Sequence, residues 1–362
     1  MRDRRGSGQR ARRATIADVA ELAGVSKTSV SFAFNKPDRL NPDTATRIRD
    51  AAVSLGYRPH PVARMLTLRR TATLGVLTPQ ALPVIFDNPF FSTFSAGVAA
   101  AADEAGYALT FLSPFQGSLA RSVDRATIDG FVAIGLFAEH PEVEEIRRAG
   151  VPMVVVDSAS LPDHPSITVD DEGGAYAAAE HLVALGHRSV LVLNIEPPGP
   201  GTEPDLESVM SHRLRGYRAG LATGGITLPD DAIFSGPSTI EGGRSTFQHA
   251  WAAGLRPTAV LAMSDAMAIG AMRAVREVGL AVPRTMSVVG FDDVDMAEYT
   301  DPPLTTVHQP VRRKGEEAVR LLLGVIHGSA PHETHLTLET RLIVRGSTAR
   351  ASELPAPRNG RG

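Results

Sequence analysis

Residues 15–35 read TIADVAELAGVSKTSVSFAFN, and this stretch predicts two short helices joined by a tight turn. Thr15 stands at the start of the first helix, and Asp18 follows it at the spacing of a capping box. Gly24 ends that helix, and Ser26 can cap the next one almost at once. The apolar face of the first helix is formed at helical spacing by Ile16, Val19, Ala20 and Ala23. Together these features indicate a helix-turn-helix unit.

The second helix has two chemically different faces. At about 100° per residue, its inward face comprises Val30, Ala33 and Phe34. Its opposite face comprises Lys27, Thr28, Ser31 and Phe32. Hydroxyls and a lysine near a helix N-terminus suit base edges and phosphates, and an exposed phenyl ring can contact thymine methyl groups. The alternative is that Phe32 is a core residue and Lys27 an ordinary solvated charge, which the neighbouring helices disfavour.

A third helix completes a predicted all-α head over residues 15–59. Asn41 supplies the N-cap of this helix, Pro42 fits its first position, and Gly56 closes it. Its apolar stripe comprises Ile48, Ala51, Ala52 and Leu55. We interpret this three-helix domain as a nucleic-acid-binding module.

The distribution of charge supports that interpretation. Residues 1–72 hold fifteen of the 37 Lys and Arg but six of the 40 Asp and Glu, a balance of +9. The remaining 22 basic and 34 acidic residues give −12, so the net charge of −3 combines a basic head with an acidic body. This asymmetry is typical of a DNA-binding protein. We expect residues 1–14, which are rich in arginine, to be a disordered basic tail.

Residues 60–72 are predicted to contain a hinge helix and a linker. Pro61 suits the first position of a helix over residues 61–67, PVARMLT. A helix of about two turns is marginal on its own, so we expect it to be ordered only when a second copy or DNA holds it. Leu66 is then a candidate wedge between base steps of the minor groove. The alternative is a plain interdomain linker with incidental apolar residues.

Residues 15–35 resemble the head of the LacI/GalR (lactose-repressor-like) family of bacterial transcriptional regulators. The resemblance continues through the hinge sequence ARML at residues 63–66 and covers nearly the whole chain after residue 14. It implies that Lys27, Thr28 and Phe32 read bases and that Leu66 is the intercalating leucine. The DNA-binding residues that we expect on these grounds are Thr15, Ser26, Lys27, Thr28, Ser29, Ser31, Phe32, Asn35, Tyr57, Ala63, Arg64 and Leu66.

The body from residue 73 alternates short apolar runs with helical patterns. The runs predicted as buried strands are Thr73–Thr78, Tyr107–Ser113, Gly130–Phe137, Met153–Val156, Val190–Ile195, Ala259–Met263 and Ser287–Phe291. Helical stretches around 92–105, 141–149 and 173–185 each end at a glycine. This alternation predicts parallel sheets with right-handed crossovers. Because roughly 290 residues exceed one core, we expect two α/β lobes.

The family resemblance implies a two-lobed, periplasmic-binding-protein-like effector and dimerisation domain over residues 73–350, followed by a flexible tail at 351–362. In that fold the chain crosses between the lobes three times. Breaks in the pattern place the crossings near Asp170, Thr305 and Thr334. Lobe 1 would then comprise about 73–170 and 305–333, and lobe 2 about 171–304 and 334–350.

Ligands of such sheets bind beyond the carboxyl ends of the strands. Carboxylates, an arginine and aromatic rings at those ends suit a polyol, which needs paired hydrogen bonds and an apolar stacking surface. The resemblance implies that Asp157, Arg213, Ser264 and Asp292 contact the effector. A lone aspartate at a strand end is more often a helix cap, and we assign that role to Asp265 and Asp293. The complete predicted effector site is Asn88, Phe90, Phe91, Phe137, Asp157, Arg213, Ser264 and Asp292.

Several other classes of protein fit the sequence poorly. It has no cysteine, so disulfides and thiolate metal sites are excluded. It shows neither a long apolar run nor a signal-peptide core, which disfavours an exported sugar-binding protein and favours the bacterial cytoplasm. Without a G-x-G-x-x-G or P-loop motif we expect no enzyme, catalytic residue or cofactor. His327, His332 and His335 are interpreted as residues of a solvated loop, not as a metal site.

The sequence therefore predicts a sequence-specific transcriptional regulator, a repressor by family precedent, which binds near-palindromic double-stranded operator DNA. A homodimer would place two recognition helices in successive major grooves, and a tetramer stays open as an alternative. A small polar effector, a sugar or a related metabolite, would bind between the lobes and change their angle. That change would order or fray the hinge helix. Whether the effector is an inducer or a corepressor stays open.

Overall fold

The computed structural model describes residues 14–58, 70–136, 140–158, 161, 163–196, 208–329 and 334–352. The chain divides into two units, Met1–Thr71 and Ala72–Gly362. Some predicted features lie outside the described residues: nearly all of the basic tail, the hinge residues Ala63, Arg64 and Leu66, Phe137 of the effector site, and His332.

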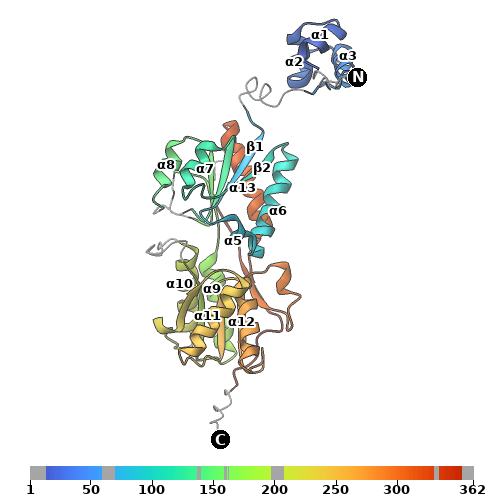
Figure 1. Ribbon diagram of the computed structural model, residues 1–362. Coiled ribbons are helices and arrows are strands. Elements are labelled where there is room, and N and C mark those ends of the chain that lie inside the picture. Colours follow the sequence, from blue (N-terminus) through green and yellow to red (C-terminus); the bar gives the residue numbers. More distant parts are fainter. Residues whose placement is uncertain are drawn as a thin grey trace, which may run out of the picture. The chain divides into compact units, whose positions relative to one another are not determined.

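The first unit contains the predicted helices α1 (Ile16–Leu22), α2 (Lys27–Asn35) and α3 (Pro42–Ser54), with a 3₁₀ turn at Pro37–Arg39 (Figure 1). The predicted capping box is confirmed, because Thr15 N donates to Asp18 Oδ2 (2.7 Å) while Thr15 Oγ1 accepts from Asp18 N (3.4 Å). Ser26 and Asn41 cap α2 and α3 as predicted. Local hydrogen-bonding chemistry therefore sets the start of each helix.

The head core consists of the apolar faces of these helices: Val19, Ala20, Ala23, Val30, Ala33, Ile48, Ala51 and Ala52. Phe34 and Tyr57 pack against it, with ring centroids 6.0 Å apart. Leu55, predicted to continue the buried stripe of α3, is instead an exposed C-cap residue. The helix ends at Ser54, one residue too early for the stripe to include it.

Lobe 1 of the second unit is built on a parallel sheet. In the described part of the chain its strand order is β11-β5-β4-β3-β1-β2. The strands are β1 (Thr73–Leu77), β2 (Ala108–Leu112), β3 (Gly130–Ile134), β4 (Met153–Val156), β5 (Ser166–Val169) and β11 (His335–Leu338). The helices are α5 (Leu82–Phe86), α6 (Pro89–Glu104), α7 (Leu119–Arg125), α8 (Val143–Arg148) and α13 (Val311–His327). Residues of α6 and α13 bury one face of the sheet, and residues of α7 and α8 bury the other.

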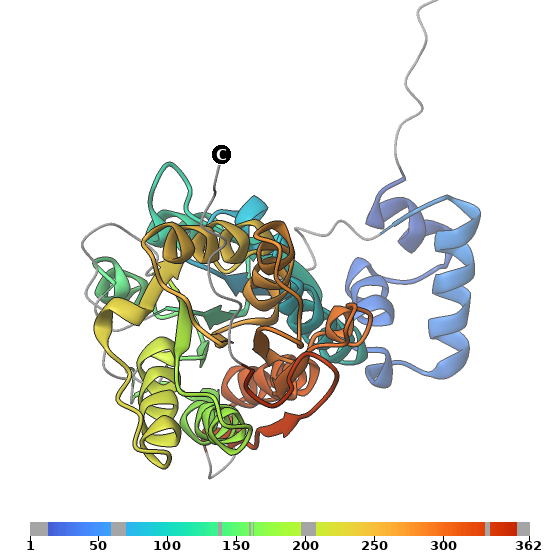
Figure 2. The ribbon, with the colours of Figure 1, turned by 90° about the horizontal axis from the view of Figure 1, so that it is seen from below.

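Lobe 2 repeats this architecture with the described strand order β12-β10-β9-β8-β6-β7. Its strands are β6 (Val190–Ile195), β7 (Ile233–Gly236), β8 (Ala259–Ala262), β9 (Ser287–Asp292), β10 (Thr305–His308) and the antiparallel β12 (Arg341–Ile343). Its helices are α9 (Asp171–Ala184), α10 (Val209–Ala222), α11 (Ile240–Ala252) and α12 (Asp265–Glu277). Figure 2 shows α9 and α10 on one side of the sheet and α11 and α12 on the other, where they form separate cores.

Two glycines allow α10 to lie directly against α9. A Cβ at Gly216 would collide with the carbonyl oxygen of Glu172, and a Cβ at Gly220 would collide with that of Tyr176. This close approach holds the N-terminal half of α10, which carries Arg213, beside the N-terminus of α9.

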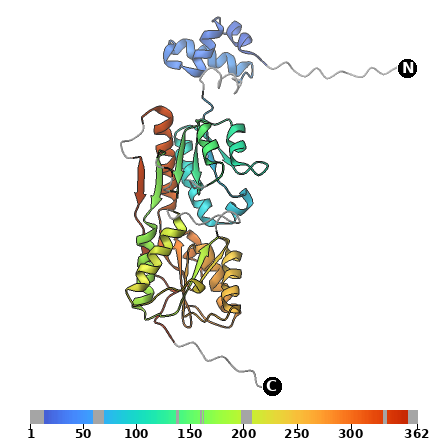
Figure 3. The ribbon, with the colours of Figure 1, turned by 90° about the vertical axis from the view of Figure 1, so that its left-hand side faces the viewer.

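The positions of two crossings between the lobes were wrong. The first described crossing follows β5 at Asp170, but the second follows β10 and the third follows β11. Residues 305–308 therefore belong to lobe 2, and residues 335–338 belong to lobe 1, where Leu336 pairs with Ile167 (Figure 3). The pattern breaks at Thr305 and Thr334 mark the starts of short strands and not the crossings themselves. β10 (TTVH) and β11 (HLTL) contain polar residues, so they lack the apolar run that marks the equally short β4 and β8 in the sequence.

Candidate functional site

The outer face of α2 has the predicted chemistry. Lys27 and Thr28 are exposed near its N-terminus, whereas Val30 and Ala33 are buried. Phe32 is half-buried, lies outside the head core, and has the Arg39 guanidinium 5.9 Å from its ring centroid. The head core therefore does not need Phe32, and the prediction that it faces outward is compatible with the structure.

Other predicted DNA contacts also have partners inside the head. Ser26 and Ser29 share a hydrogen bond between their hydroxyls (3.0 Å), and Asn35 Nδ2 donates to Ser31 Oγ (3.3 Å). Tyr57 is half-buried against Phe34, and burial raises the pKa of its phenol. These side chains thus support the shape of the reading face in addition to any contact they make with DNA.

Arg213 and Asp292 come together in lobe 2. Arg213 is buried on α10, where its Nε donates to Asp171 Oδ1 (2.8 Å) and its Nη1 donates to the carbonyl oxygen of Met263. Nη1 also lies 3.8 Å from Asp292 Oδ1, and the guanidinium carbon lies 3.6 Å from the ring centroid of Phe291. Burial raises the pKa of Asp171, and the Arg213 guanidinium partly offsets this rise. The arginine is therefore held rigidly, with its charge compensated.

Asp292 is buried at the end of β9 with an unusual backbone. Its φ is 121°, and Asp157, at the end of β4, has a φ of 58°. Each such conformation costs a residue other than glycine about 1–3 kcal/mol and is concentrated at functional sites. Burial raises the pKa of Asp292 to about 6, although Arg213 and the hydrogen bond from Gln309 lower it. Asp292 is therefore protonated more readily than an exposed aspartate.

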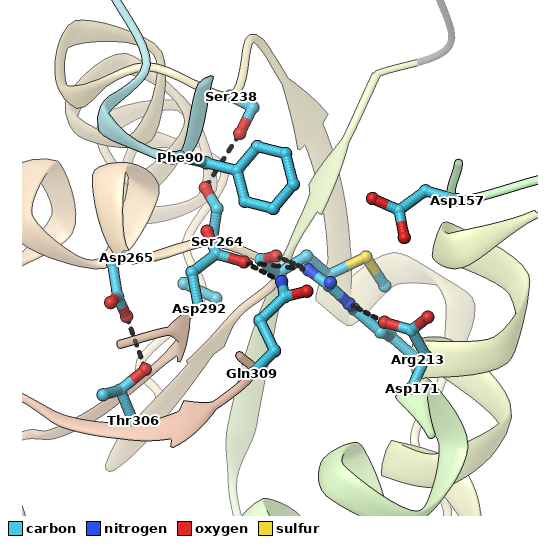
Figure 4. Close-up of polar contacts among 12 residues, drawn as sticks. Phe90, Asp157, Asp171, Arg213, Ser238, Ser264, Asp265, Asp292, Thr306 and Gln309 are labelled. Atoms are coloured by element: carbon cyan, nitrogen blue, oxygen red, sulfur yellow. Dashed lines mark hydrogen bonds and ion pairs between the residues drawn. The ribbon is translucent and has the colours of Figure 1, made fainter. Parts of the chain in front are cut away.

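Asp157 joins this group through two residues that sequence reasoning missed. Lys314, fully buried on α13, donates from Nζ to Asp157 Oδ1 (2.7 Å) and to Gln309 Oε1 (2.5 Å). Gln309, on the second crossing, donates from Nε2 to Asp292 Oδ1 (2.6 Å). Figure 4 shows Asp157, Gln309 and Asp292 gathered in one region. A continuous polar path thus runs from lobe 1 to lobe 2.

The sequence did contain a signal for Lys314. It lies on the buried stripe of α13, which also includes Val311, Gly315 and Ala318. A lysine on an apolar helical stripe requires a buried counter-charge. Sequence alone could not identify Asp157 as that partner, because 157 residues separate the two.

A second polar link joins the lobes through Asn88 and Ser264. Asn88 caps α6, and its Nδ2 donates to Ser238 Oγ (3.2 Å), which in turn donates to Ser264 Oγ (2.9 Å). Ser264 caps α12 and is buried. These two predicted site residues therefore have structural roles and also bring lobe 1 into contact with lobe 2.

The predicted aromatic residues are more buried than expected for a stacking surface. Phe90 lies in the lobe 1 core, stacked on Phe94, and its ring centroid is 5.4 Å from Lys314 Nζ. Phe91 is half-buried and edge-on to Phe90, with centroids 5.5 Å apart. Phe90 thus covers the Lys314 ammonium, and Figure 4 shows its ring beside Ser264.

The assignment of Asp265 and Asp293 as helix caps was wrong. Ser264 caps α12, while the fully buried Asp265 accepts from Val294 N (2.9 Å) and Thr306 Oγ1 (2.5 Å). Asp293 pairs with Arg345 (2.7 Å) and His308 (2.9 Å). Both carboxylates bind partners from distant segments, which a prediction based on local capping cannot include.

Two of the three histidines predicted to lie in a solvated loop, His327 and His335, belong to regular elements. His327 is the last residue of α13 and contacts the Tyr107 hydroxyl, and His335 begins β11 and contacts Ser166. Among the described residues no group of three His, Cys, Asp or Glu side chains could hold a metal ion. In the same residues no helix is long and apolar enough to cross a membrane.

Comparisons with known proteins match both units. The family of bacterial regulatory proteins described as lacI matches residues 15–60, and a periplasmic binding protein-like domain matches residues 179–348. The chain is 31% identical over 346 residues to the HTH-type transcriptional regulator CelR of Thermobifida fusca, covering 94% of this chain and 99% of CelR. It is 32% identical over 343 residues to the ribose operon repressor of Escherichia coli K12, covering 92% and 99%.

Solved structures give the same result. The lac repressor dimer bound to operator and the anti-inducer ONPF has a TM-score of 0.78 at 29% identity, covering 93% of this chain and 100% of that chain. The complex of the transcriptional regulator CelR with cellobiose has a TM-score of 0.67 at 30% identity, covering 92% and 100%. The chain therefore belongs to the lacI family of bacterial regulatory proteins, which are DNA-binding transcription regulators and not enzymes.

Proposed function

We propose that this regulator is a repressor that holds a near-palindromic operator through α2 and is controlled by a small saccharide or related metabolite bound between its lobes. The observation that carries the proposal is the polar path from Asp157 through Lys314 and Gln309 to Asp292 and Arg213. A ligand that engages this path contacts both lobes at once.

The DNA half of the proposal is supported by the exposed face of α2. Lys27 and Thr28 lie beside the cap residue Ser26, at the end of the helix that would enter a major groove. Lysine can bind a phosphate or a guanine edge, and threonine can bind either a base or the backbone. We assign base reading to Lys27, Thr28 and Phe32, and backbone contacts to the other predicted head residues.

The effector half is supported by the chemistry of the strand ends. Asp157 and Asp292 follow β4 and β9, and Arg213 lies beside Asp292. Carboxylates accept hydrogen bonds from hydroxyl groups, and a fixed guanidinium donates to ring or hydroxyl oxygens. The relatives support a saccharide, because CelR was solved with cellobiose and another relative is a ribose operon repressor.

Control of DNA binding follows from the links between lobes. The Asn88–Ser238 hydrogen bond and the backbone pairing of Ser158 with Ser208 join the lobes away from the crossings. A ligand that favours one lobe arrangement by about 1–3 kcal/mol would change operator affinity about 5- to 150-fold. In a cytoplasmic homodimer, or in a tetramer built from two dimers, this change would act on the paired hinge segments.

Operator binding measured by fluorescence anisotropy across a panel of mono- and disaccharides tests the proposal. At least one saccharide should change the operator affinity of the wild type. Arg213→Ala and Asp292→Ala should keep operator affinity but lose that response. Arg218→Ala is the matched control, because Arg218 lies on the same helix with an exposed partner, Asp230. A response in both site variants equal to that of the control would exclude this site.

A further inference from the structure

The two buried cations of the effector site are already engaged by oxygen atoms. Arg213 donates to Asp171 Oδ1 at 2.8 Å and to a backbone carbonyl oxygen. Lys314 donates to Asp157 Oδ1 at 2.7 Å and to Gln309 Oε1 at 2.5 Å. An anionic ligand that contacts either cation would have to share it with these oxygen atoms or displace them, and displacement would leave a buried carboxylate uncompensated.

The charge of the whole group also disfavours an anionic ligand. Among these described side chains, Asp157, Asp171 and Asp292 oppose Lys314 and Arg213, so the group has a formal charge of −1. All five are buried or nearly so, with exposed side-chain fractions between 0% and 14%. Charges this deeply buried are poorly screened by solvent, and like charges brought together at a binding site cost several kcal/mol.

Three further basic residues among those that the structure describes already have carboxylate partners. On α10, Arg215 pairs with Glu172 and Arg218 pairs with Asp230. Beyond β9, Arg345 pairs with Asp293. The sequence of the stretches 137–139, 159–160 and 197–207, which the structure does not describe, contains no lysine, arginine or histidine.

We infer that the site selects an uncharged polyhydroxylated ligand and rejects sugar phosphates and sugar acids, with the Asp157–Lys314 pair as the specificity determinant. This inference rests on the proposed function and names its ligand class. The Asp157–Lys314 pair determines the preference between neutral and anionic ligands, because loss of either charge changes the formal charge of the group. Without the Asp157 charge the group becomes neutral and the ammonium loses a carboxylate partner. Without the Lys314 charge the group becomes more negative.

Matched pairs of probes test the inference on the full-length protein: ribose and ribose 5-phosphate, glucose and glucose 6-phosphate, cellobiose and cellobionate. Isothermal titration calorimetry gives, for each pair, the dissociation constant of the anionic member divided by that of the neutral member. For the wild type, the anionic member should bind about 100-fold more weakly or worse. Asp157→Asn should lower this ratio about tenfold or more, because its Lys314 can then engage the anion. Lys314→Gln should keep it at or above the wild-type value.

Asp230→Asn is the matched control. It removes the same charge from an exposed side chain outside the site, so its ratio should equal that of the wild type. Retained operator binding shows that each variant is folded. The inference is overturned if the wild type binds an anionic member as tightly as its neutral partner, or if Asp157→Asn and Asp230→Asn give the same ratio. These results leave the proposed function intact. If no member of any pair, and no saccharide of the wider panel, changes operator binding, the proposed function fails instead.

Discussion

Replacing Lys314 with methionine tests the buried pair at the centre of the site. Methionine fills a similar space on the α13 stripe, so the substitution removes the charge and creates little cavity. Breaking a buried ion pair by removing one partner costs about 3–5 kcal/mol. Because the Asp157 side chain is 14% exposed while Lys314 is fully buried, water can reach the remaining carboxylate. We therefore expect Lys314→Met to lower the free energy of unfolding by an amount near the lower end of this range, about 3 kcal/mol.

A double-mutant cycle with Asp157→Asn separates the energy of the ion pair from the cost of changed side-chain packing. Asp157→Asn alone leaves the Lys314 ammonium buried with Gln309 as its described partner, so it should also destabilise. The double variant removes both charges and should be more stable than the sum of the single losses predicts. For contacting residues in one network, a coupling of about 2 kcal/mol is expected.

Urea denaturation followed by circular dichroism measures each free energy of unfolding. Arg312→Met is the control, because Arg312 lies on the same helix in an exposed pair with Glu316 and should change stability by less than about 0.5 kcal/mol. Equal stability of Lys314→Met and Arg312→Met, or a coupling near zero in the cycle, would refute the account of this pair.

Three further predictions concern pH, helix packing and DNA contact. A ligand that donates a hydrogen bond to Asp292 favours the ionised form of this carboxylate. Because burial raises the pKa of Asp292 to about 6, saccharide affinity should fall about tenfold between pH 7 and pH 5. Calorimetry that shows neither this fall nor proton release on binding at pH 6 would contradict the prediction. Gly216→Ala should lower stability by about 1–3 kcal/mol in thermal denaturation, because its Cβ meets the Glu172 carbonyl; a wild-type melting point would show that α9 and α10 can separate freely. Thr28→Ala should weaken specific operator binding by about 1–3 kcal/mol. Thr46→Ala is the control, because Thr46 is exposed on α3, and it should leave operator binding unchanged. Equal losses of operator affinity in gel-shift titrations would show that Thr28 does not belong to the reading face.

Features determined by neighbouring residues were predictable from the sequence. The Thr15–Asp18 capping box and the Ser26 and Asn41 caps involve partners within three residues, so spacing alone reveals them. The seven predicted strands are present, and they are apolar runs such as GFVAI of β3, which is buried throughout. Parallel strands buried on both faces give this continuous signal. The edge strand β2 is the exception to the predicted burial, because most of its residues are half-buried.

Features determined by distant contacts were not predictable. β7, β11 and β12 are three or four residues long and partly exposed, so they have no clear period. The Asp265 carboxylate follows a strand like a cap, but its hydroxyl partner is Thr306, 41 residues away. The family resemblance implied a shared site for Asp157, Arg213 and Asp292. The fold links them through Lys314 and Gln309, whose partners lie too far along the chain to be found from sequence.

The central claim is that one ligand, held by both lobes, sets the affinity for operator DNA. Linkage requires the ligand to change operator affinity by the same factor by which the operator changes ligand affinity. Measuring both factors on the wild type with one active saccharide tests the claim most directly. We predict two equal factors within about 5- to 150-fold, and factors near one for Arg213→Ala. A saccharide that binds the free and the operator-bound protein with the same affinity would contradict the claim.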